Sequence, residues 1–199
     1  MIIRGFGIEY AYRPQCEPRS MAKSDSFFIR ASVTSNGSTY VESETDLGSY
    51  VNLGVSKSTL LRIHNIAVQY TDAEGVVDAI SGASALKVGW QLTTQTQTGL
   101  VRATNKSLVS SGSLQAYNSQ VAEDGSASAD FATGFITQDL DIAPQDWKNG
   151  YLIGVDQLYL GIDQNGTFTS GNIIVALVME VTLENATQAS SVALALSQQ

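Results

Sequence analysis

The chain has 199 residues, of which 43% are hydrophobic and only 15% are charged, and its formal net charge is −8. A chain of this length buries roughly 70% of its unfolded surface, enough for one self-supporting core, and no Pro-rich or charge-rich linker divides it. The single cysteine, Cys16, excludes an internal disulfide and a Cys-based metal site, and no apolar run reaches the ~20 residues of a membrane span.

The charge is unevenly distributed between the N-terminal residues and the rest of the chain. The first 30 residues carry five basic and three acidic groups, a net charge of +2, whereas the remaining residues carry six basic and 16 acidic groups, a net charge of −10. A negative body repels phosphate, so we expect no sequence-specific nucleic-acid binding. The N-terminal arm, residues 1–26, lacks the dense Arg/Lys run of proteins that package RNA directly.

The first predicted strands show hydrophobic alternation with a period of two. Phe27–Val33 alternates apolar and polar side chains, which predicts a half-buried strand. Asn36-Gly37 follows, a strong hairpin signal, and predicts that Thr39–Thr45 returns antiparallel to the first strand. Val51–Val55 repeats the alternation.

Two longer segments change the parity of their apolar positions. In Thr59–Tyr70 the parity shifts near His64-Asn65, which predicts a β-bulge there because a one-residue slip otherwise turns the apolar face outward. Tyr151–Asp163 shows a second shift around Asp156-Gln157, which predicts another long strand that bends at mid-length. Bent strands of this kind are typical of closed or double-sheet β folds.

The remaining segments complete an all-β pattern. The longest apolar stripe, Ile173–Leu183, predicts a strand that is covered on both faces over part of its length, and helical signals are limited to Leu114–Ala122 and to Ala186–Ser197, a short helix or an extended tail. The pattern predicts a single jelly roll or antiparallel β-sandwich of about eight strands over residues 27–184, with an N-terminal arm and a C-terminal tail, residues 185–199. Further strands are predicted at Leu86–Thr93, Ser107–Tyr117 and Ser128–Thr137.

Residues with chemical potential are few. His64 is the only histidine, and its position at the predicted bulge favours a structural role with a local hydrogen bond over a catalytic or metal-binding one. Glu42, Glu44 and Asp46, and likewise Asp139 and Asp141, lie at alternate positions that could serve acid–base chemistry or calcium between subunits. Solvated turns and edge-strand charges are the stronger expectation. We therefore expect no enzyme activity, no catalytic residues, no cofactor and no metal.

The most distinctive segment runs from Pro144 to Ile162. Trp147-Lys-Asn-Gly150 predicts a tight turn that carries an aromatic side chain directly into the next strand. Trp147 and Tyr151 either cap the open end of the sandwich or anchor a neighbouring subunit.

The order of these elements resembles the single-jelly-roll capsid proteins of icosahedral viruses, particularly tailless, often membrane-containing ones. The resemblance covers roughly residues 25–185: an arm before Phe27–Val33, about eight strands, the Trp147–Gly150 turn with Tyr151–Ile162, and then Ile173–Leu183. It implies a virion location, copies of the chain and other capsid components as partners in a homo-oligomer, and room for contact between the N-terminal arm and an internal membrane.

A low charge content, Ala/Ser/Gln-rich ends and the lack of a reactive cluster also favour large packed contacts between subunits. We expect these contacts to exchange the two arms. The alternatives are a carbohydrate-binding jelly roll with Trp90, Tyr117 and Tyr159 on one face, and an adhesin or pilus subunit completed by a donated strand along Asn172–Val178. The expected subunit-contact residues are Arg4, Arg13, Trp147, Tyr151, Val192, Leu194 and Leu196.

Overall fold

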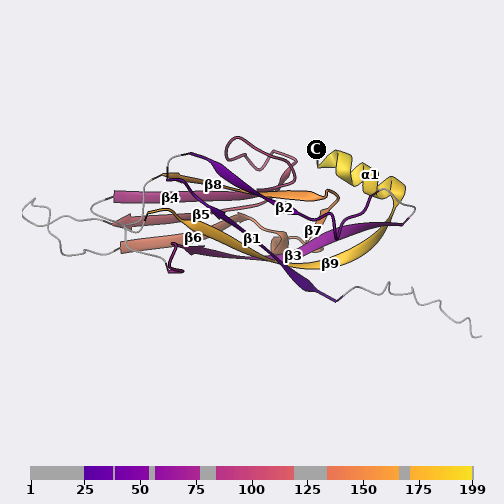
Figure 1. Ribbon diagram of the computed structural model, residues 1–199, viewed down its shortest axis with the longest axis horizontal. Coiled ribbons are helices and arrows are strands. Elements are labelled where there is room, and N and C mark those ends of the chain that lie inside the picture. Colours follow the sequence, from indigo (N-terminus) through magenta and orange to yellow (C-terminus); the bar gives the residue numbers. More distant parts are fainter. Residues whose placement is uncertain are drawn as a thin grey trace, which may run out of the picture.

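The computed structural model describes residues 25–37, 39–53, 57–76, 84–118, 134–165 and 171–198, and in these ranges the chain forms two antiparallel sheets packed as a sandwich (Figure 1). A short 3-10 helix, η1 (Pro144–Asp146), and one α-helix, α1 (Gln188–Ser197), accompany the sheets. The first sheet has the order β1 (Phe27–Thr34), β9 (Ile174–Thr187), β3 (Lys57–Thr71) and β7 (Tyr151–Ile153). The second has the order β2 (Val41–Asp46), β8 (Gln157–Asn165), β4 (Ser84–Thr93), β5 (Leu108–Asn118) and β6 (Gly134–Ile142).

The strand pairing is nested, with early strands paired to late ones. β1 pairs with β9, β2 with β8, β3 with β7, and β4 with β5, all antiparallel. This is the pattern of a long antiparallel ribbon rolled into two sheets, which is the jelly roll, and β6 extends the second sheet beyond β5. The predicted jelly-roll fold class is therefore confirmed.

The core lies between the two sheets and follows the predicted alternation. Inward-facing Leu92, Leu160 and Ile162 of the second sheet and Leu177 and Met179 of the first are fully buried. Apolar burial of this kind is the main stabilising term of the fold.

A buried hydrogen bond between two aromatic side chains crosses this core. Trp90 Nε1 donates a 2.8 Å hydrogen bond to Tyr70 Oη, which joins β4 in one sheet to β3 in the other. The bond satisfies the indole N–H, which would otherwise be buried at a cost. Burial raises the pKa of Tyr70 to about 12.

The predicted bulge in the long first-sheet strand is confirmed. The register of β3 against β9 shifts between Ile63 and Asn65, so His64 is the additional residue. The shift keeps Leu61 and Ile63 on one side of the bulge, and Ile66 on the other, within the same core.

The predicted hairpin at Asn36-Gly37 is wrong. β1 pairs with β9 and β2 pairs with β8, so the two strands lie at the edges of different sheets. Gly37 does adopt the left-handed conformation expected of a turn, with φ of 80°. The turn redirects the chain between sheets because each strand finds a longer partner late in the sequence.

The predicted long bent strand over Tyr151–Asp163 is also wrong. Tyr151–Asp163 is not one bent strand, because β7 belongs to the first sheet and β8 to the second, so the parity shift marks a crossing between sheets at residues 154–156. Of the predicted Val51–Val55 strand, the described residues 51–53 form only an isolated bridge, between Asn52 and Thr59, and residues 54 and 55 lie outside the described residues. Val51 itself is buried.

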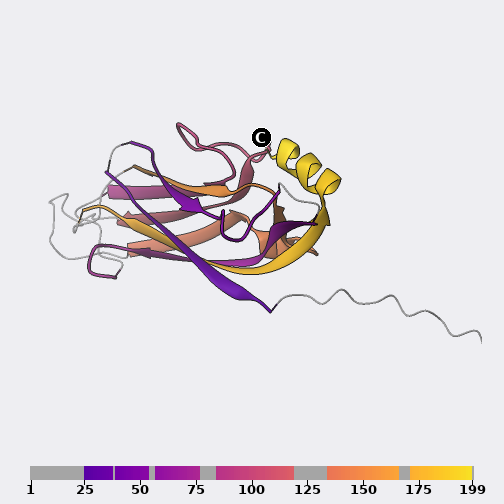
Figure 2. The same ribbon diagram turned by 45° about the vertical axis from the view of Figure 1, so that its right-hand side comes forward.

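The two helical signals have different outcomes. β5 runs through Leu114 to Asn118, so the first part of the Leu114–Ala122 segment is strand and the rest lies outside the described residues. The C-terminal signal is the short helix α1, and β9 continues to Thr187, past the predicted end of the sandwich at residue 184. The C-terminal tail is therefore not an extended arm: α1 lies across one end of the sandwich (Figure 2).

Candidate subunit-contact surface

The turn before β7 approaches the bulged strand β3 very closely. Gly150 has φ of 63°, and a Cβ atom there would lie 2.2 Å from the carbonyl oxygen of Ile63. Only glycine fits both the conformation and the space. Arg62 reinforces the approach by donating to Asn149 O at 2.6 Å, while its guanidinium makes a bidentate ion pair with Glu184 at 2.5 and 2.7 Å. The turn is thus fixed to the first sheet.

The side chain of Gln145, in η1, also binds β3. Its Oε1 accepts from the backbone N–H of Ile66 and its Nε2 donates to the Ile66 carbonyl, both at 3.2 Å. A side-chain amide thereby replaces one residue of a neighbouring strand just beyond the bulge.

Three of the predicted contact residues meet beside α1. Trp147 of the turn, Tyr151 of β7 and Leu194 of α1 line one groove of about 320 Å³, together with Lys106 of the β4–β5 loop. Trp147 is 55% exposed, whereas Tyr151 is half-buried and its pKa is raised by burial. Of the two roles left open by the sequence, Tyr151 caps the sandwich end and Trp147 faces solvent.

The helix α1, which forms one wall of this groove, is held to the sandwich by hydrogen bonds at its C-terminal end. Gln198 is buried, its Nε2 donates to Leu152 O at 2.6 Å, and its Oε1 accepts from Gly154 N at 2.9 Å. Its carbonyl oxygen accepts from Thr94 Oγ1 at 2.6 Å. Sequence reasoning missed Gln198, because a single glutamine in a polar tail carries no periodic signal.

The other predicted contact residues divide into two groups. Val192 and Leu196 lie exposed on α1, and Leu196 is 64% exposed. Arg4 and Arg13 lie outside the described residues. We call Trp147, Tyr151 and the exposed or half-buried apolar residues of α1 the α1-end surface; the helix residues are Val192, Leu194 and Leu196.

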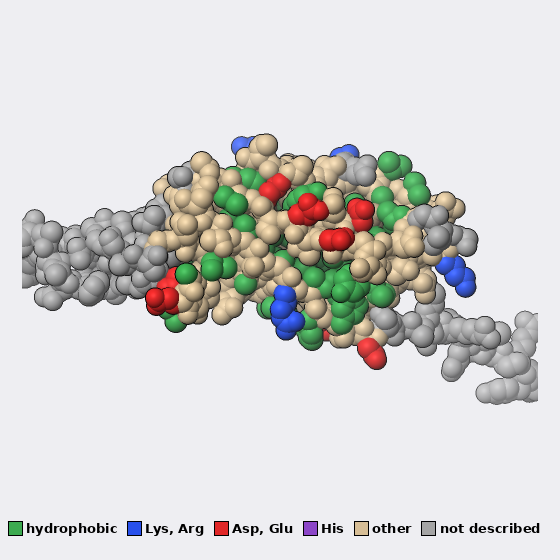
Figure 3. Space-filling view, viewed as in Figure 1, with side chains coloured by type: hydrophobic (Ala, Val, Ile, Leu, Met, Phe, Trp, Pro, Cys, Tyr) green, Lys and Arg blue, Asp and Glu red, His purple; other side chains and the backbone are tan. Residues whose placement is uncertain are grey.

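A second apolar area was not predicted. Phe28 at the start of β1 is largely exposed, and Tyr50, also exposed, contacts the Phe27 ring with a centroid distance of 5.3 Å. Hydrophobic side chains gather on this part of the molecule in the space-filling view (Figure 3). A groove of about 470 Å³ connects the loop that carries Tyr50 to Ala195 of α1. The adjacent aromatic pair Phe27-Phe28 was the available sequence signal.

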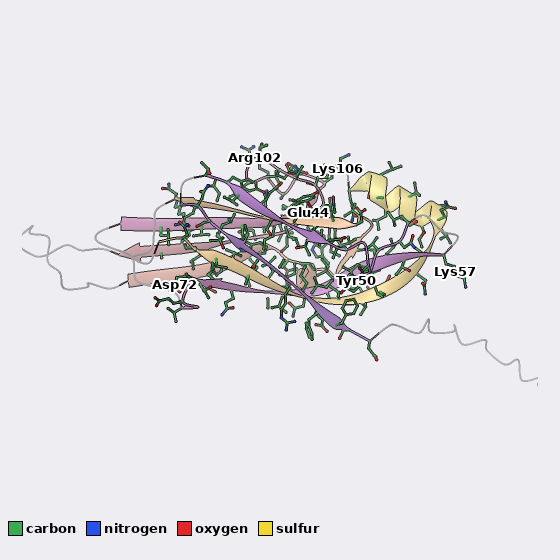
Figure 4. The ribbon with its side chains drawn as sticks, in the orientation of Figure 1. Glu44, Tyr50, Lys57, Asp72, Arg102 and Lys106 are labelled. Carbon is green, nitrogen blue, oxygen red and sulfur yellow. The ribbon has the colours of Figure 1, made fainter. Side chains whose placement is uncertain are left out.

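Among the acidic residues of the edge strand β2, Glu44 and Asp46 are exposed, as expected of solvated charges, whereas Glu42 is half-buried and holds part of the chain in place. Glu42 accepts from Thr96 Oγ1, from Gln97 N at 3.0 Å and from Tyr40 Oη at 3.3 Å. It therefore holds the β4–β5 loop against the outer face of the second sheet. Acidic side chains gather over β2 (Figure 3), and Figure 4 shows Glu44 there, with Arg102 and Lys106 of the loop nearer the edge of the view.

Glycine and glutamine residues allow that loop to lie close to the sheet. Gln91 donates to Gly99 O at 3.0 Å and accepts from Val101 N at 2.6 Å. A Cβ atom at Gly89 would lie 2.6 Å from Leu100 Cδ1. The outer face of the second sheet is therefore covered in part by the chain itself.

His64 lies at the bulge, where its Nε2 is 2.8 Å from Thr182 Oγ1, the local hydrogen bond that was expected. Within the described ranges, no group of three or more His, Cys, Asp and Glu side chains is arranged to hold a metal ion. In the same part of the chain, no helix is long and apolar enough to cross a membrane.

The aromatic face of the carbohydrate-binding alternative does not form as proposed. Trp90 is buried in the core, and Tyr159 is half-buried on β8 with its hydroxyl donating to Gln157 Oε1 at 2.8 Å. The side chain of Tyr117 lies outside the described part of the structure.

Comparisons with known proteins give likenesses of structure only. No protein-family model matches the chain, and no curated protein matches its sequence. Among solved structures, Merkel cell polyomavirus VP1 in complex with disialyllactose matches with a TM-score of 0.35 and 9% identity, covering 83% of this chain and 96% of that one. The tailspike protein of Acinetobacter baumannii phage AM24 matches with a TM-score of 0.17 and 11% identity, covering 78% of this chain and 27% of that one.

Proposed function

We propose that this jelly roll is a structural subunit that self-assembles into a capsid-type shell and is located in the virion. The fold supports this role, because jelly rolls are common in capsid proteins. Lectins and cupins share the fold, but the burial of Trp90 weakens the lectin alternative, and the single histidine of the chain does not suit a cupin metal site. The role we assign is structural rather than enzymatic.

The observation that carries the proposal is the exposed apolar character of the α1-end surface. Trp147, Val192 and Leu196 leave water only if another molecule covers them. An exposed aromatic side chain beside a groove, as Trp147 is beside the groove that Leu194 lines, is typical of the central residues of subunit contacts. The chain carries few charges overall, so burial there desolvates few ionised groups.

The charge distribution supports protein partners over nucleic acid. Acidic residues on β2 and the negative net charge of the body repel phosphate. Copies of the chain and other shell components are the partners we propose, and an N-terminal arm with a net positive charge suits contact with acidic protein surfaces or an anionic internal membrane.

Size-exclusion chromatography with light scattering, followed by negative-stain imaging, tests the proposal. We expect the wild-type chain to form large regular assemblies, and Trp147→Ala to shift the population to smaller species. Val76→Ala is the matched control, because Val76 is 57% exposed but belongs to the β3–β4 loop. A wild-type chain that stays monomeric at high concentration contradicts the proposed function, whereas assembly unaffected by Trp147→Ala moves the contact away from the α1-end surface.

A further inference from the structure

The first sheet has an open edge beyond the bulge of β3. β7 pairs only with Leu61–Ile63, and Gln145 occupies the backbone groups of Ile66. Because backbone direction repeats every two residues, the N–H and C=O groups of Val68 and Tyr70 point the same way as those of Ile66. No strand of the described chain pairs with Ala67–Thr71 on that side. An unpaired edge of this kind is a template for a further strand.

A groove between the two sheets runs beside this edge. It has a volume of about 230 Å³ and lies between β3 and β6, which are side by side in both ribbon views. Its apolar lining includes Ile66, Val68 and Tyr70 of β3 and Leu140 of β6, and Leu140 is largely exposed. A strand added to β3 would point alternate side chains into this groove.

The rim of the groove is acidic. Asp139 lines it and Asp141 follows at the next outward position of β6, and both carboxylates are exposed. Both lie close enough to Tyr70 for their charges to contribute to its raised pKa, after the larger effect of burial. A segment that fits this site therefore has one apolar face and a basic residue near one end.

Residues 5–12 of the chain, Gly-Phe-Gly-Ile-Glu-Tyr-Ala-Tyr, have this composition. Phe6, Ile8, Tyr10 and Tyr12 recur at every second position, which is the pattern of a strand with one apolar face. Arg4 and Arg13 stand immediately before and after the segment. We propose that residues 5–12 of a second copy add as a strand to the Ala67–Thr71 edge, with apolar side chains of the segment in the groove and one of the two flanking arginines, at one end of the added strand, near Asp139 and Asp141. This inference rests on the proposed self-assembly.

The residues between the segment and β1 are long enough for the segment to reach a second copy. Phe27 is aligned through Val181 with Ile63, and Thr34 is aligned through Ile174 with Thr71, so β1 runs parallel to β3. The first residue of β1 therefore lies level with the bulge, before the Ala67–Thr71 stretch of β3. β1 is the outer strand on the opposite side of the sheet from this stretch. The residues between the segment and β1, 13–26, span at most ~45 Å when extended, enough to reach a neighbour. Main-chain pairing with side-chain pockets is a general mode of peptide recognition.

Photocrosslinking in the full-length assembly tests the inference. A photoreactive amino acid replaces Gln69, which is exposed on β3, and ¹⁵N-labelled and unlabelled copies are mixed before assembly. We expect mass spectrometry to find crosslinks to residues 5–12 that join labelled to unlabelled chains. The same photoreactive residue at the exposed Ser32 of β1 is the control and is expected to give at least ten-fold fewer crosslinks to this segment.

Charge reversal provides a second readout. Asp139→Lys with Asp141→Lys is expected to lower the crosslink yield about ten-fold, and adding Arg4→Glu with Arg13→Glu is expected to restore it, because complementary charges are re-formed. Assemblies without inter-copy crosslinks to residues 5–12, or with crosslinks only within one copy, overturn this inference and leave the proposed function intact. A chain that does not assemble overturns both.

Discussion

The space between the sheets and the end that carries α1 are held together by different means. Between the sheets, Leu92 of β4 is paired with Leu160 of β8, and both are fully buried by apolar neighbours. At the α1 end, closure depends on single polar contacts: Gln145 on Ile66, and Gln198 on β7 and the residues after it. The interior is thus stabilised by the apolar surface area that many side chains bury together. The α1 end is stabilised by individual hydrogen bonds, each made by one residue.

The largest expected effect lies in the interior. Leu160→Ala removes a fully buried side chain and leaves a cavity, which we expect to lower the free energy of unfolding by about 3 kcal/mol. Urea denaturation measures the change, and Val76→Ala, at an exposed position, is expected to change it by less than about 0.5 kcal/mol. If the two variants were equally stable, the interior would not be the main source of stability.

A smaller loss in the free energy of unfolding, about 2 kcal/mol, is expected for a change in the turn before β7, which packs against β3. Gly150→Ala places a methyl group against the Ile63 carbonyl and forces a left-handed conformation on a residue with a side chain. Gly99→Ala is the control, because a Cβ atom there meets nothing within 4 Å. Thermal unfolding of both variants separates the local clash from a general effect of replacing glycine.

This difference between the regions also explains what the sequence could predict. Two-residue alternation predicted most of the described strands, the β3 bulge at His64 and the all-β sandwich, because burial acts on every position of a strand. It did not specify which strands pair, so Asn36-Gly37 was interpreted as a hairpin although β1 and β2 pair with β9 and β8. The tertiary partner, which is distant in sequence, overrides the local turn signal.

The candidate surface was predicted in part for the same reason. Trp147 and Tyr151 stand out as aromatics at a turn, and Val192, Leu194 and Leu196 as apolar residues in a polar tail. The hydrogen bonds of the Gln198 side chain and the role of Glu42 in holding the β4–β5 loop have no sequence signature. Each depends on one side chain that binds backbone groups far away in the chain.

The side-chain hydrogen bonds of Gln198 give a third prediction. Gln198→Ala leaves Leu152 O and Gly154 N without their side-chain partners, at a cost of about 1.5 kcal/mol. We expect faster hydrogen exchange at Gly154 and along α1, with little change in the β-sheet amides. Gln188→Ala, at an exposed position of the same helix, is the control. Equal exchange in the two variants would mean that α1 is held by its apolar contacts alone.

A fourth and smaller effect, about 1 kcal/mol, is expected for the loop over the second sheet. Glu42→Ala removes the acceptor for Thr96 and for the Gln97 amide, so hydrogen exchange at Gln97 should accelerate. Glu44→Ala is the matched control, since Glu44 lies on the same strand but accepts from Gln157 instead. Protection of Gln97 that survives in the Glu42 variant would assign the loop's position to Gln91.

The last prediction returns to the interior and concerns alkaline pH. Burial raises the pKa of Tyr70 to about 12, above its ordinary value near 10, because the phenolate is disfavoured away from water. A folded-state pKa that is raised contributes stability that is fully present below about pH 10 and is lost as the pH rises through about 12, since the unfolded chain ionises first. Tyr40, also raised to about 12, adds to the same loss.

We therefore expect the unfolding midpoint in urea to fall between pH 9 and pH 12 and to fall less steeply in Tyr70→Phe. That variant also loses the Trp90 hydrogen bond, so it should be less stable than wild type at pH 8 and approach it as the pH rises. Parallel pH profiles for the two proteins would show that Tyr70 ionises as readily in the folded chain as in the unfolded one. The space between the sheets would then admit water at Trp90, and the contrast with the polar α1 end would no longer hold there.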